Sequence, residues 1–376
     1  MSGLAEQLAQ LPQDVKARLE RYHFDPARLL ALGARLARGE VDSGVVEGRI
    51  EPPRADDVKE LPAAGTPERR ALEERGAEAL RDGRVALVVL AGGMATRMGG
   101  VVKALVEALP GKTFLDIRLA EIDALGKRFG KAPPLWLMTS DATDGGIKKA
   151  LGARLDGYRT ATFTQHLALR LTPEGKLYLD GENKPSEHAP GHGDLPDALK
   201  KSGLLARFVA AGGHTLLLTN LDNLGATLDP ALIGFHLAHE MPLTSEVVDK
   251  LDEDRGGIPV RVDDKLRILE EFRIPPSFDP HTVRVFNTNT FYVNAPALLE
   301  LEMDWRFFAV KKKVGDTPVV QFERIVNEIT SELSTVYVRL PRDGASSRFL
   351  PVKDPAELER RRPEIEAVAH ARGILS

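Results

Sequence analysis

The sequence predicts an α/β fold organised around a mixed, mostly parallel sheet. Between residues 84 and 240, short apolar runs alternate with helical patterns, as they do where helices join parallel strands. The run at residues 85–91 is continuously apolar, which suits a strand buried on both faces, and it ends at Gly92 and Gly93. After residue 240 the strand candidates follow one another closely, which favours antiparallel pairs in that part of the chain.

Composition places the chain among globular proteins and excludes several classes of function. Its 376 residues are 43% hydrophobic, enough to fill a sizeable core. The formal net charge is −4, which does not favour nucleic acid as a partner. There is no cysteine, so disulfides and thiolate catalysis are excluded. The chain opens without a basic, apolar leader and has no apolar run long enough to cross a bilayer, so we expect a cytoplasmic protein without a membrane partner.

The loop after the first buried strand is the strongest candidate for an anion site. Gly92 and Gly93 let a ligand approach the backbone, and the donors Thr96, Arg97 and Lys103 follow. Ligands of open α/β sheets bind beyond the carboxyl ends of the strands, where this loop lies. The loop matches neither the dinucleotide fingerprint nor the P-loop. The alternative interpretation is an ordinary turn between a strand and a helix.

Residues 1–80 are expected to form an N-terminal helical segment that covers the main domain. Apolar residues recur at helical spacing from Leu11 to Tyr22. Residues 44–53, which end in two prolines, are expected to form a loop. Thr66, with a proline directly after it, predicts a capped helix that runs to about Arg81. No pattern in this segment indicates chemistry.

The main domain is expected to span residues 81–340, and residues 341–376 to form a short C-terminal segment. Apolar residues three or four apart predict the helices, and apolar runs or alternations predict the strands. In chain order after the first strand we expect a helix at 113–129, a strand at 135–138, a helix at 146–151, a strand at 162–165, a hairpin at 170–179, strands at 214–219, 244–248, 258–262, 267–272 and 283–293, a solvated loop at 311–313, a helix at 321–333, a strand at 335–340 and a terminal helix at 355–372.

Two polar segments of the main domain are candidates for ligand binding. Residues 185–194 are rich in Gly, His and Pro and have little to bury, which is typical of a binding loop, although a plain surface loop would look the same. Asp222 follows the strand at 214–219, where a carboxylate can hold Mg²⁺ together with substrate phosphates. Its alternative role is to cap the next helix. His236 and His239 lack the spacing of a zinc protease and are expected to pack or face solvent.

Seven short motifs occur in order between residues 85 and 353. They are Leu90-Ala91-Gly92-Gly93 with Lys103, Phe163-Thr164-Gln165, Pro190-Gly191-His192-Gly193-Asp194, Asn220-Leu221-Asp222-Asn223-Leu224-Gly225-Ala226-Thr227, Glu246-Val247-Val248-Asp249-Lys250, Phe286-Asn287-Thr288-Asn289 and Arg348-Phe349-Leu350-Pro351-Val352-Lys353. Each is weak alone. In this order they resemble the eukaryotic-type UTP–glucose-1-phosphate uridylyltransferases, also called UDP-glucose pyrophosphorylases.

The resemblance implies a Rossmann-like nucleotidyltransferase domain that joins UTP and a hexose 1-phosphate into a UDP-hexose and pyrophosphate. It implies that Lys103 neutralises the departing pyrophosphate, that Asp222 binds Mg²⁺, and that Lys250 and Lys353 reach phosphates. The substrate-binding residues it implies are Leu90, Ala91, Gly92, Gly93 and Gln165 around uracil, and Gly191, His192, Asn220, Asn287, Asn289 and Glu270 around the sugar phosphate. This set suits the reaction, because a sugar phosphate is already ionised and needs cations and positioning rather than a general base.

The chain departs from the family pattern in three places. Residues 100–102, directly before Lys103, lack the family's Gly-Pro. Ala95 stands where the family has a glycine in its phosphate loop. Only residues 354–376 follow Lys353, so the long C-terminal β-helix of the family is not expected, and oligomers formed through it are not carried over. The sequence makes no prediction of the oligomeric state.

Two other functions remain open. The first is a UDP-N-acetylhexosamine or broad-specificity UDP-sugar pyrophosphorylase, which the segments 192–194 and 223–226 favour less than the glucose enzyme. The second is a catalytically silent sugar-nucleotide-binding protein, which would not need Lys103, Asp222 and two further lysines together. An NAD-dependent dehydrogenase is disfavoured because the glycine fingerprint is missing.

Overall fold

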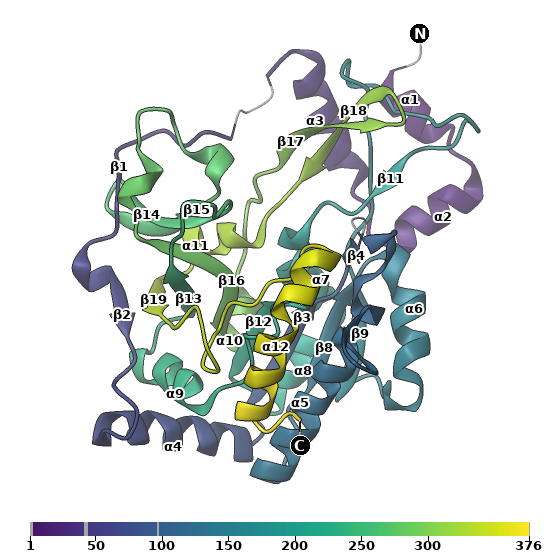
Figure 1. Cartoon of the computed structure of the whole chain (residues 1–376). Coiled ribbons are helices and arrows are strands. Elements are labelled where there is room, and N and C mark those ends of the chain that lie inside the picture. The colour runs from purple at the N-terminus through teal and green to yellow at the C-terminus, as the bar shows by residue number, and fades with distance from the viewer. Residues whose placement is uncertain (1–2, 41–43, 96–97, 376) are drawn as a thin grey trace.

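A mixed eight-stranded sheet crosses the molecule with helices on both faces, and this confirms the predicted α/β class (Figure 1). The structure is a computed structural model that describes residues 3–40, 44–95 and 98–375. Thr96 and Arg97, two of the expected donors, lie outside the described residues. Among the residues described, no helix has the length and apolar character needed to cross a membrane.

The strand order of the central sheet is β2-β19-β13-β16-β12-β3-β8-β9. These strands are β2 (Val58–Glu60), β3 (Val85–Leu90), β8 (Leu135–Thr139), β9 (Thr160–Thr164), β12 (Thr215–Asn220), β13 (Leu243–Asp249), β16 (Val285–Asn294) and β19 (Thr335–Arg339). Only β16 runs against its neighbours β12 and β13. All the other neighbouring pairs are parallel, so the carboxyl ends of these strands share one edge of the sheet.

Alternate residues of β3 enter two separate cores, one on each face of the sheet. Leu87 and Val89 pack in the core that also holds side chains of α5, α6, α9 and α12, whereas Ala86 and Val88 pack with α7, α8 and α10. From residue 67 onward the described helices are α4 (Pro67–Arg81), α5 (Phe114–Phe129), α6 (Asp141–Leu151), α7 (Leu195–Lys201), α8 (Leu204–Ala210), α9 (Pro230–His239), α10 (Ala295–Glu300), α11 (Ile329–Glu332) and α12 (Pro355–Ala371). Both faces of β3 are therefore buried, as its continuous apolar run predicts.

The N-terminal residues make two different contacts with the main domain. The helices α1 (Leu4–Ala9), α2 (Gln13–Arg21) and α3 (Pro26–Ala37) pack on a third core with Leu169, Val320 and Phe322. Figure 1 shows these helices beside β17 and β18, at the end of the molecule opposite α4. The predicted helix α4 is confirmed, and the Thr66 side chain caps it by accepting from the Arg69 N–H. It crosses α9 so closely that a Cβ on Gly234 would lie 1.9 Å from the Leu72 carbonyl oxygen.

Several short strands lie outside the central sheet. They are β1 (Ile50–Glu51), β4 (Met94–Ala95), β5 (Val101–Val102), β6 (Glu107–Leu109), β7 (Lys112–Thr113), β10 (Ala168–Leu169), β11 (Glu187–His188), β14 (Ile258–Val262), β15 (Lys265–Leu269), β17 (Phe308–Val314) and β18 (Thr317–Glu323). The hairpin of β14 and β15 confirms a pair of strands in this region, although the second strand covers residues 265–269 rather than the predicted 267–272.

Three local predictions are wrong. Residues 311–313 belong to β17 rather than to a loop, because their exposed lysines sit on a strand whose backbone pairs with β18 across a turn at Gly315. Residues 321–333 do not form one helix, since their first part completes β18, whose buried residues pack on the N-terminal helices. Residues 44–53 are not all loop, because β1 pairs with β14.

Candidate active site

The shared carboxyl edge of the sheet collects the candidate residues. Leu90 and Asn220 end the adjacent strands β3 and β12, and the Leu221 N–H donates to the Leu90 carbonyl at 3.3 Å. The antiparallel strand β16 begins at this edge, so it brings Asn287 and Asn289 to the same end of the sheet. One edge thus carries residues from distant parts of the sequence, as expected of a binding site in an open α/β sheet.

Lys103 and Asp222 form an ion pair at this edge. The Lys103 Nζ lies 2.8 Å from the Asp222 Oδ2, and the two side chains are 20% and 16% exposed. The Lys103 backbone N–H donates to the Gly93 carbonyl at 3.3 Å, which ties the lysine to the glycine loop. The same Asp222 Oδ2 accepts the Val352 N–H at 3.2 Å. Three segments that are far apart in the sequence therefore converge on one carboxylate.

The C-terminal segment reaches this edge because two buried side chains hold it there. Asn223 donates its amide to the Arg348 carbonyl at 3.1 Å and accepts the Leu350 N–H at 2.8 Å. The Arg348 guanidinium donates twice to the Glu246 carboxylate, from Nε at 3.0 Å and from Nη2 at 2.5 Å. Burial opposes the charge on Arg348, but the Glu246 carboxylate outweighs it and raises the pKa of the guanidinium. Hydrogen bonds from Asn223 and the ion pair of Arg348 with Glu246 thus hold the C-terminal segment in place.

The glycine loop packs against Gln165 at the position where the resemblance implies uracil. A Cβ on Gly92 would lie 2.7 Å from the Gln165 Oε1, so a side chain there would push the Gln165 amide out of its place. Within the described residues, no heavy atom lies within 4 Å of a Cβ built on Gly93, whose neighbourhood is open. The Gln165 Nε2 donates to the Gly191 carbonyl at 3.0 Å, which joins this loop to the segment 190–194. Ala95, which replaces a family glycine, is buried in β4.

A chain of amide side chains connects Glu270 to Asn220. Asn327 donates to the Glu270 Oε1 at 2.5 Å and accepts from the Asn287 Nδ2 at 3.3 Å. The Asn289 N–H donates to the Asn287 Oδ1 at 3.2 Å, and its Nδ2 donates to the Asn220 Oδ1 at 3.0 Å. Asn289 has a φ of 56°, a left-handed conformation that asparagine tolerates and that often marks a functional position.

Two titratable groups of the sugar region are shifted by burial. Burial raises the pKa of Glu270, which favours its protonated form more than in water. Burial lowers the pKa of His192 to about 4, so the imidazole is neutral at pH 7. The His192 Nδ1 accepts the Val326 N–H at 3.0 Å, which leaves the proton of the neutral ring on Nε2. The neutral His192 ring therefore offers an uncharged donor suited to a hydroxyl group.

Two implied phosphate ligands do not contact the ion pair. The Lys250 Nζ donates to the Pro280 carbonyl at 3.0 Å. Lys353 is exposed, lies outside any strand and donates its backbone N–H to Glu357 at 2.7 Å. Among the hydrogen bonds of the described residues, neither ammonium reaches Asp222. Their phosphate roles stay predictions, although Lys353 directly follows the residue whose backbone binds Asp222.

The sequence reasoning missed Asn327 and Arg324. Asn327 bridges Glu270 and Asn287, but it falls in the stretch wrongly predicted as one helix. The backbone of Arg324 donates to the Pro190 carbonyl at 2.7 Å and accepts the Gly193 N–H at 3.0 Å, so it supports the loop that carries His192. No local pattern marks either residue, because their partners lie far away in the sequence.

Comparison with known proteins agrees with this geometry. The family model described as UTP–glucose-1-phosphate uridylyltransferase matches residues 35–362. A UTP–glucose-1-phosphate uridylyltransferase of Encephalitozoon cuniculi is 31% identical over 301 residues, which cover 76% of this chain and 59% of the relative. The chain spans about three fifths of the length of the curated relatives it matches.

Two solved structures share the fold at lower identity. A UDP-glucose phosphorylase from Trypanosoma brucei has a TM-score of 0.76 and 23% identity, with 96% of this chain and 79% of that chain covered. A UDP-N-acetylglucosamine pyrophosphorylase from the same organism, in complex with an inhibitor, has a TM-score of 0.69 and 21% identity, with 83% and 72% covered. Proteins named for different sugars thus share this architecture, so the fold alone does not decide the sugar.

Proposed function

The chain belongs to the UTP–glucose-1-phosphate uridylyltransferase family, and from this premise we propose that it transfers a uridylyl group from UTP to glucose 1-phosphate. A phosphate oxygen of the sugar phosphate attacks the α-phosphorus of UTP, and the bond from that phosphorus to the bridging oxygen of the pyrophosphoryl group breaks. The products are UDP-glucose and pyrophosphate. The observation that carries the proposal is the Lys103–Asp222 pair at 2.8 Å, beside the polar chain that ends at Asn220.

In this proposal the residues of the chain bind uracil, orient the sugar hydroxyls and neutralise the charge on the leaving group. Gln165 and the backbone around Gly92 present amide donors and acceptors, which can match the edge of uracil. The amide chain from Glu270 to Asn220 orients the sugar hydroxyls. Lys103 places a positive charge where negative charge grows on the leaving group, and such charge stabilisation commonly contributes most of the rate enhancement in phosphoryl transfer.

Asp222 is the residue that would hold Mg²⁺. Its carboxylate lies at the end of a buried strand, and its Oδ2 is shared by Lys103 and the Val352 N–H. In the described part of the chain no group of three or more metal-binding side chains occurs. One carboxylate still fits this ion, because Mg²⁺ is usually bound by one or two carboxylates together with substrate phosphates. When bound, Mg²⁺ neutralises phosphate charge and orients the phosphates of UTP.

The choice of glucose rests on the curated relatives, whose names specify glucose 1-phosphate. The rival sugar is an N-acetylhexosamine, whose larger 2-substituent needs room beside the sugar. Asn327 bridges Glu270 and Asn287 in the region proposed for the sugar. We favour glucose 1-phosphate because of the names of these relatives.

The test measures pyrophosphate release from UTP with glucose 1-phosphate, galactose 1-phosphate and N-acetylglucosamine 1-phosphate, with Mg²⁺ and with a chelator. We expect the highest kcat/KM with glucose 1-phosphate and no turnover without the metal. Lys103→Gln should lower kcat by about 10²-fold, whereas the control Lys112→Gln, at an exposed lysine, should not. Binding of UDP-glucose without any turnover would instead favour a catalytically silent binding protein.

A further inference from the structure

Asp194 ends the motif at residues 190–194, and it is completely buried, with 0% exposure. It directly precedes α7, yet among the described residues its carboxylate makes no capping hydrogen bond to that helix. Its oxygens are used elsewhere. The Oδ2 accepts the His166 N–H at 2.8 Å, and the Oδ1 accepts from the Arg324 Nε at 2.6 Å. One carboxylate therefore joins the segment after β9 to the segment after β18.

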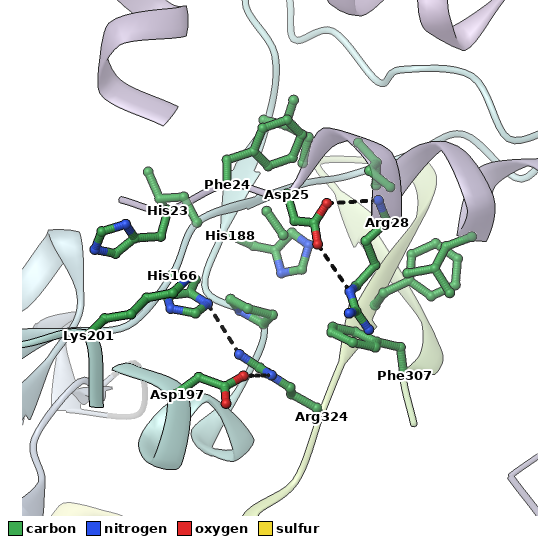
Figure 2. A pocket seen from close by; sticks show the side chains of 17 residues that line it. His23, Phe24, Asp25, Arg28, His166, His188, Asp197, Lys201, Phe307 and Arg324 are labelled. Atoms are coloured by element: carbon green, nitrogen blue, oxygen red, sulfur yellow. Dashed lines mark hydrogen bonds and ion pairs between the residues drawn. The ribbon is translucent and has the colours of Figure 1, made fainter. Parts of the chain in front are cut away.

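A third contact closes a triangle around this carboxylate. Figure 2 shows the Arg324 guanidinium between the His166 ring and the Asp197 carboxylate, with a dashed line to each. The Arg324 Nη2 lies 3.2 Å from the His166 Nδ1, and this Nδ1 accepts because a guanidinium only donates. Burial, with Lys201 and Arg324 nearby, lowers the pKa of His166 to about 3, so the ring is neutral at pH 7 and can accept. His166, Asp194 and Arg324 thus contact one another pairwise.

The backbone of Arg324 packs directly against two glycines of the loop. A Cβ on Gly191 would lie 2.6 Å from the Arg324 carbonyl oxygen, and a Cβ on Gly193 would lie 2.6 Å from the Arg324 carbonyl carbon. The atoms met are backbone atoms, so a side chain at either glycine would push the two segments apart. The backbone and the guanidinium of one residue therefore hold the loop that carries His192.

The segment after Arg324 makes two contacts in the sugar region. The Val326 N–H donates to the His192 Nδ1 at 3.0 Å and so orients that ring. Asn327 donates to the Glu270 carboxylate and belongs to the amide chain. Because Val326 and Asn327 follow Arg324 closely in the sequence, a shift of Arg324 would move both contacts.

The uracil side of the candidate site is joined to the same triangle. His166 directly follows Gln165, the residue assigned to uracil. The Gln165 Nε2 donates to the Gly191 carbonyl at 3.0 Å, and the Asp194 N–H donates to the same carbonyl at 3.2 Å. Gln165 is thus held against the sugar loop by its own amide and by the contacts of the neighbouring His166.

From these contacts we propose that the buried pair Asp194–Arg324 positions the uracil-binding Gln165 and the sugar-binding His192 relative to each other. This role rests on the function proposed above. The two residues are 0% and 4% exposed, so they act through their neighbours rather than by touching a substrate. A displacement of about 1 Å can lower an enzymatic rate by about 10²-fold. A fault in the pair should therefore change the selection of the base and the binding of the sugar phosphate together.

The first variant is Asp194→Asn, which keeps the shape of the side chain but replaces one acceptor with a donor. Either the Arg324 Nε or the His166 N–H then loses its partner. Pyrophosphate release is measured with UTP and with CTP, and with varied glucose 1-phosphate. We expect the preference for UTP to fall and the KM for glucose 1-phosphate to rise, each by at least about threefold, the scale of one misplaced hydrogen bond.

The matched control is Asp57→Asn. Asp57 is also largely buried and pairs with an arginine, since its Oδ1 lies 2.5 Å from the Arg261 Nη2. It directly precedes β2, the outermost strand of the central sheet. The control should lower the urea midpoint without changing the UTP preference or the KM. The same result in Asp194→Asn would overturn the positioning role and leave the pair only a structural one, and a change for one substrate alone would also overturn it.

A second variant covers the case in which Asp194→Asn does not fold. Arg324→Lys keeps the positive charge, but a lysine cannot contact Asp194, Asp197 and His166 together, so the same joint change is expected. Absence of turnover in the unchanged protein would refute the proposed function instead. Calorimetry with UDP-glucose, which carries both uracil and sugar, then decides the positioning role. Asp194→Asn should weaken UDP-glucose binding by at least about threefold, whereas equal affinities of the variant and the unchanged protein would overturn the role.

Discussion

Replacement of Arg348 by methionine should destabilise the fold strongly, because it leaves Glu246 charged and buried without its partner. Glu246 is 0% exposed and Arg348 is 3% exposed, and two charge-assisted hydrogen bonds join them. Removal of one member of a buried ion pair costs about 3–5 kcal/mol. We expect Arg348→Met to lower the free energy of unfolding by that amount, a large part of the stability of an ordinary domain.

The effect should depend on pH in a direction that follows from the carboxyl group. Burial raises the pKa of Glu246, and Arg348 opposes that rise, so the variant retains burial with only the weaker opposition of Arg372. The pKa of this carboxyl group is higher in the folded state than its unfolded value of about 4.3. Its contribution to folding stability is therefore fully present below about pH 4.3 and is lost as the pH rises through the folded-state pKa. The variant should therefore lose less stability near pH 5 than near pH 8, since a group of raised pKa is still partly protonated at the lower pH.

Urea unfolding followed by circular dichroism, at both pH values, measures the loss. The double variant Glu246→Met with Arg348→Met is the control, because an apolar replacement of both partners is often neutral. We expect it to recover most of the lost stability. A deficit in Arg348→Met below about 1 kcal/mol, the scale of an exposed pair, would refute the reasoning, as would a double variant no more stable than the single one.

Four further outcomes follow from the same contacts. Asp222→Ala should abolish pyrophosphate release without changing the circular dichroism spectrum, and Mg²⁺-dependent activity near the original level would contradict its metal role. Gln165→Ala should relax the preference for UTP when other nucleoside triphosphates compete, and an unchanged preference would refute the uracil assignment. Gly234→Ala should lower the urea midpoint by the equivalent of about 1–3 kcal/mol, because its Cβ would overlap the Leu72 carbonyl; an unchanged midpoint would mean that α4 and α9 separate freely. Lys353→Ala should lower kcat by about 10²-fold and change KM less, since the charge it would meet develops in the transition state; an unchanged kcat would leave the lysine only a structural role.

The central strands were predictable from the sequence because burial on both faces leaves a strong local signal. Each of the strands β3, β8 and β12 contains an uninterrupted apolar run, and each is found where its run predicts. The hairpin of β17 and β18 gave a weak signal, because β17 is an exposed strand whose lysines resemble a solvated loop. Its partner buries Val320 and Phe322 against helices from the other end of the chain, a contact that no local window contains.

The candidate site was predictable to the extent that its residues occur in family motifs. Those motifs named both members of the pair Lys103–Asp222 and most of the amide chain. They did not include Asn327, whose role depends on a bridge between Glu270 and Asn287 that exists only after folding. The exposed position of Lys353 could not be predicted either, because residues 351–353 form no helix or strand whose pattern would indicate which side chains face solvent.

The last residue of β12 and the three residues that follow it explain why the site needs a segment from the end of the chain. Asn220 joins the amide chain on one side, and Leu221 is buried in the core. Asp222 faces Lys103 and the Val352 N–H, and Asn223 holds the backbone of residues 348–350. One short turn therefore joins the proposed sugar, metal and C-terminal contacts. Because Asn223 uses both ends of its amide, loss of the C-terminal segment would leave a buried polar group unpaired directly beside Asp222, and the geometry of the carboxylate would change with it.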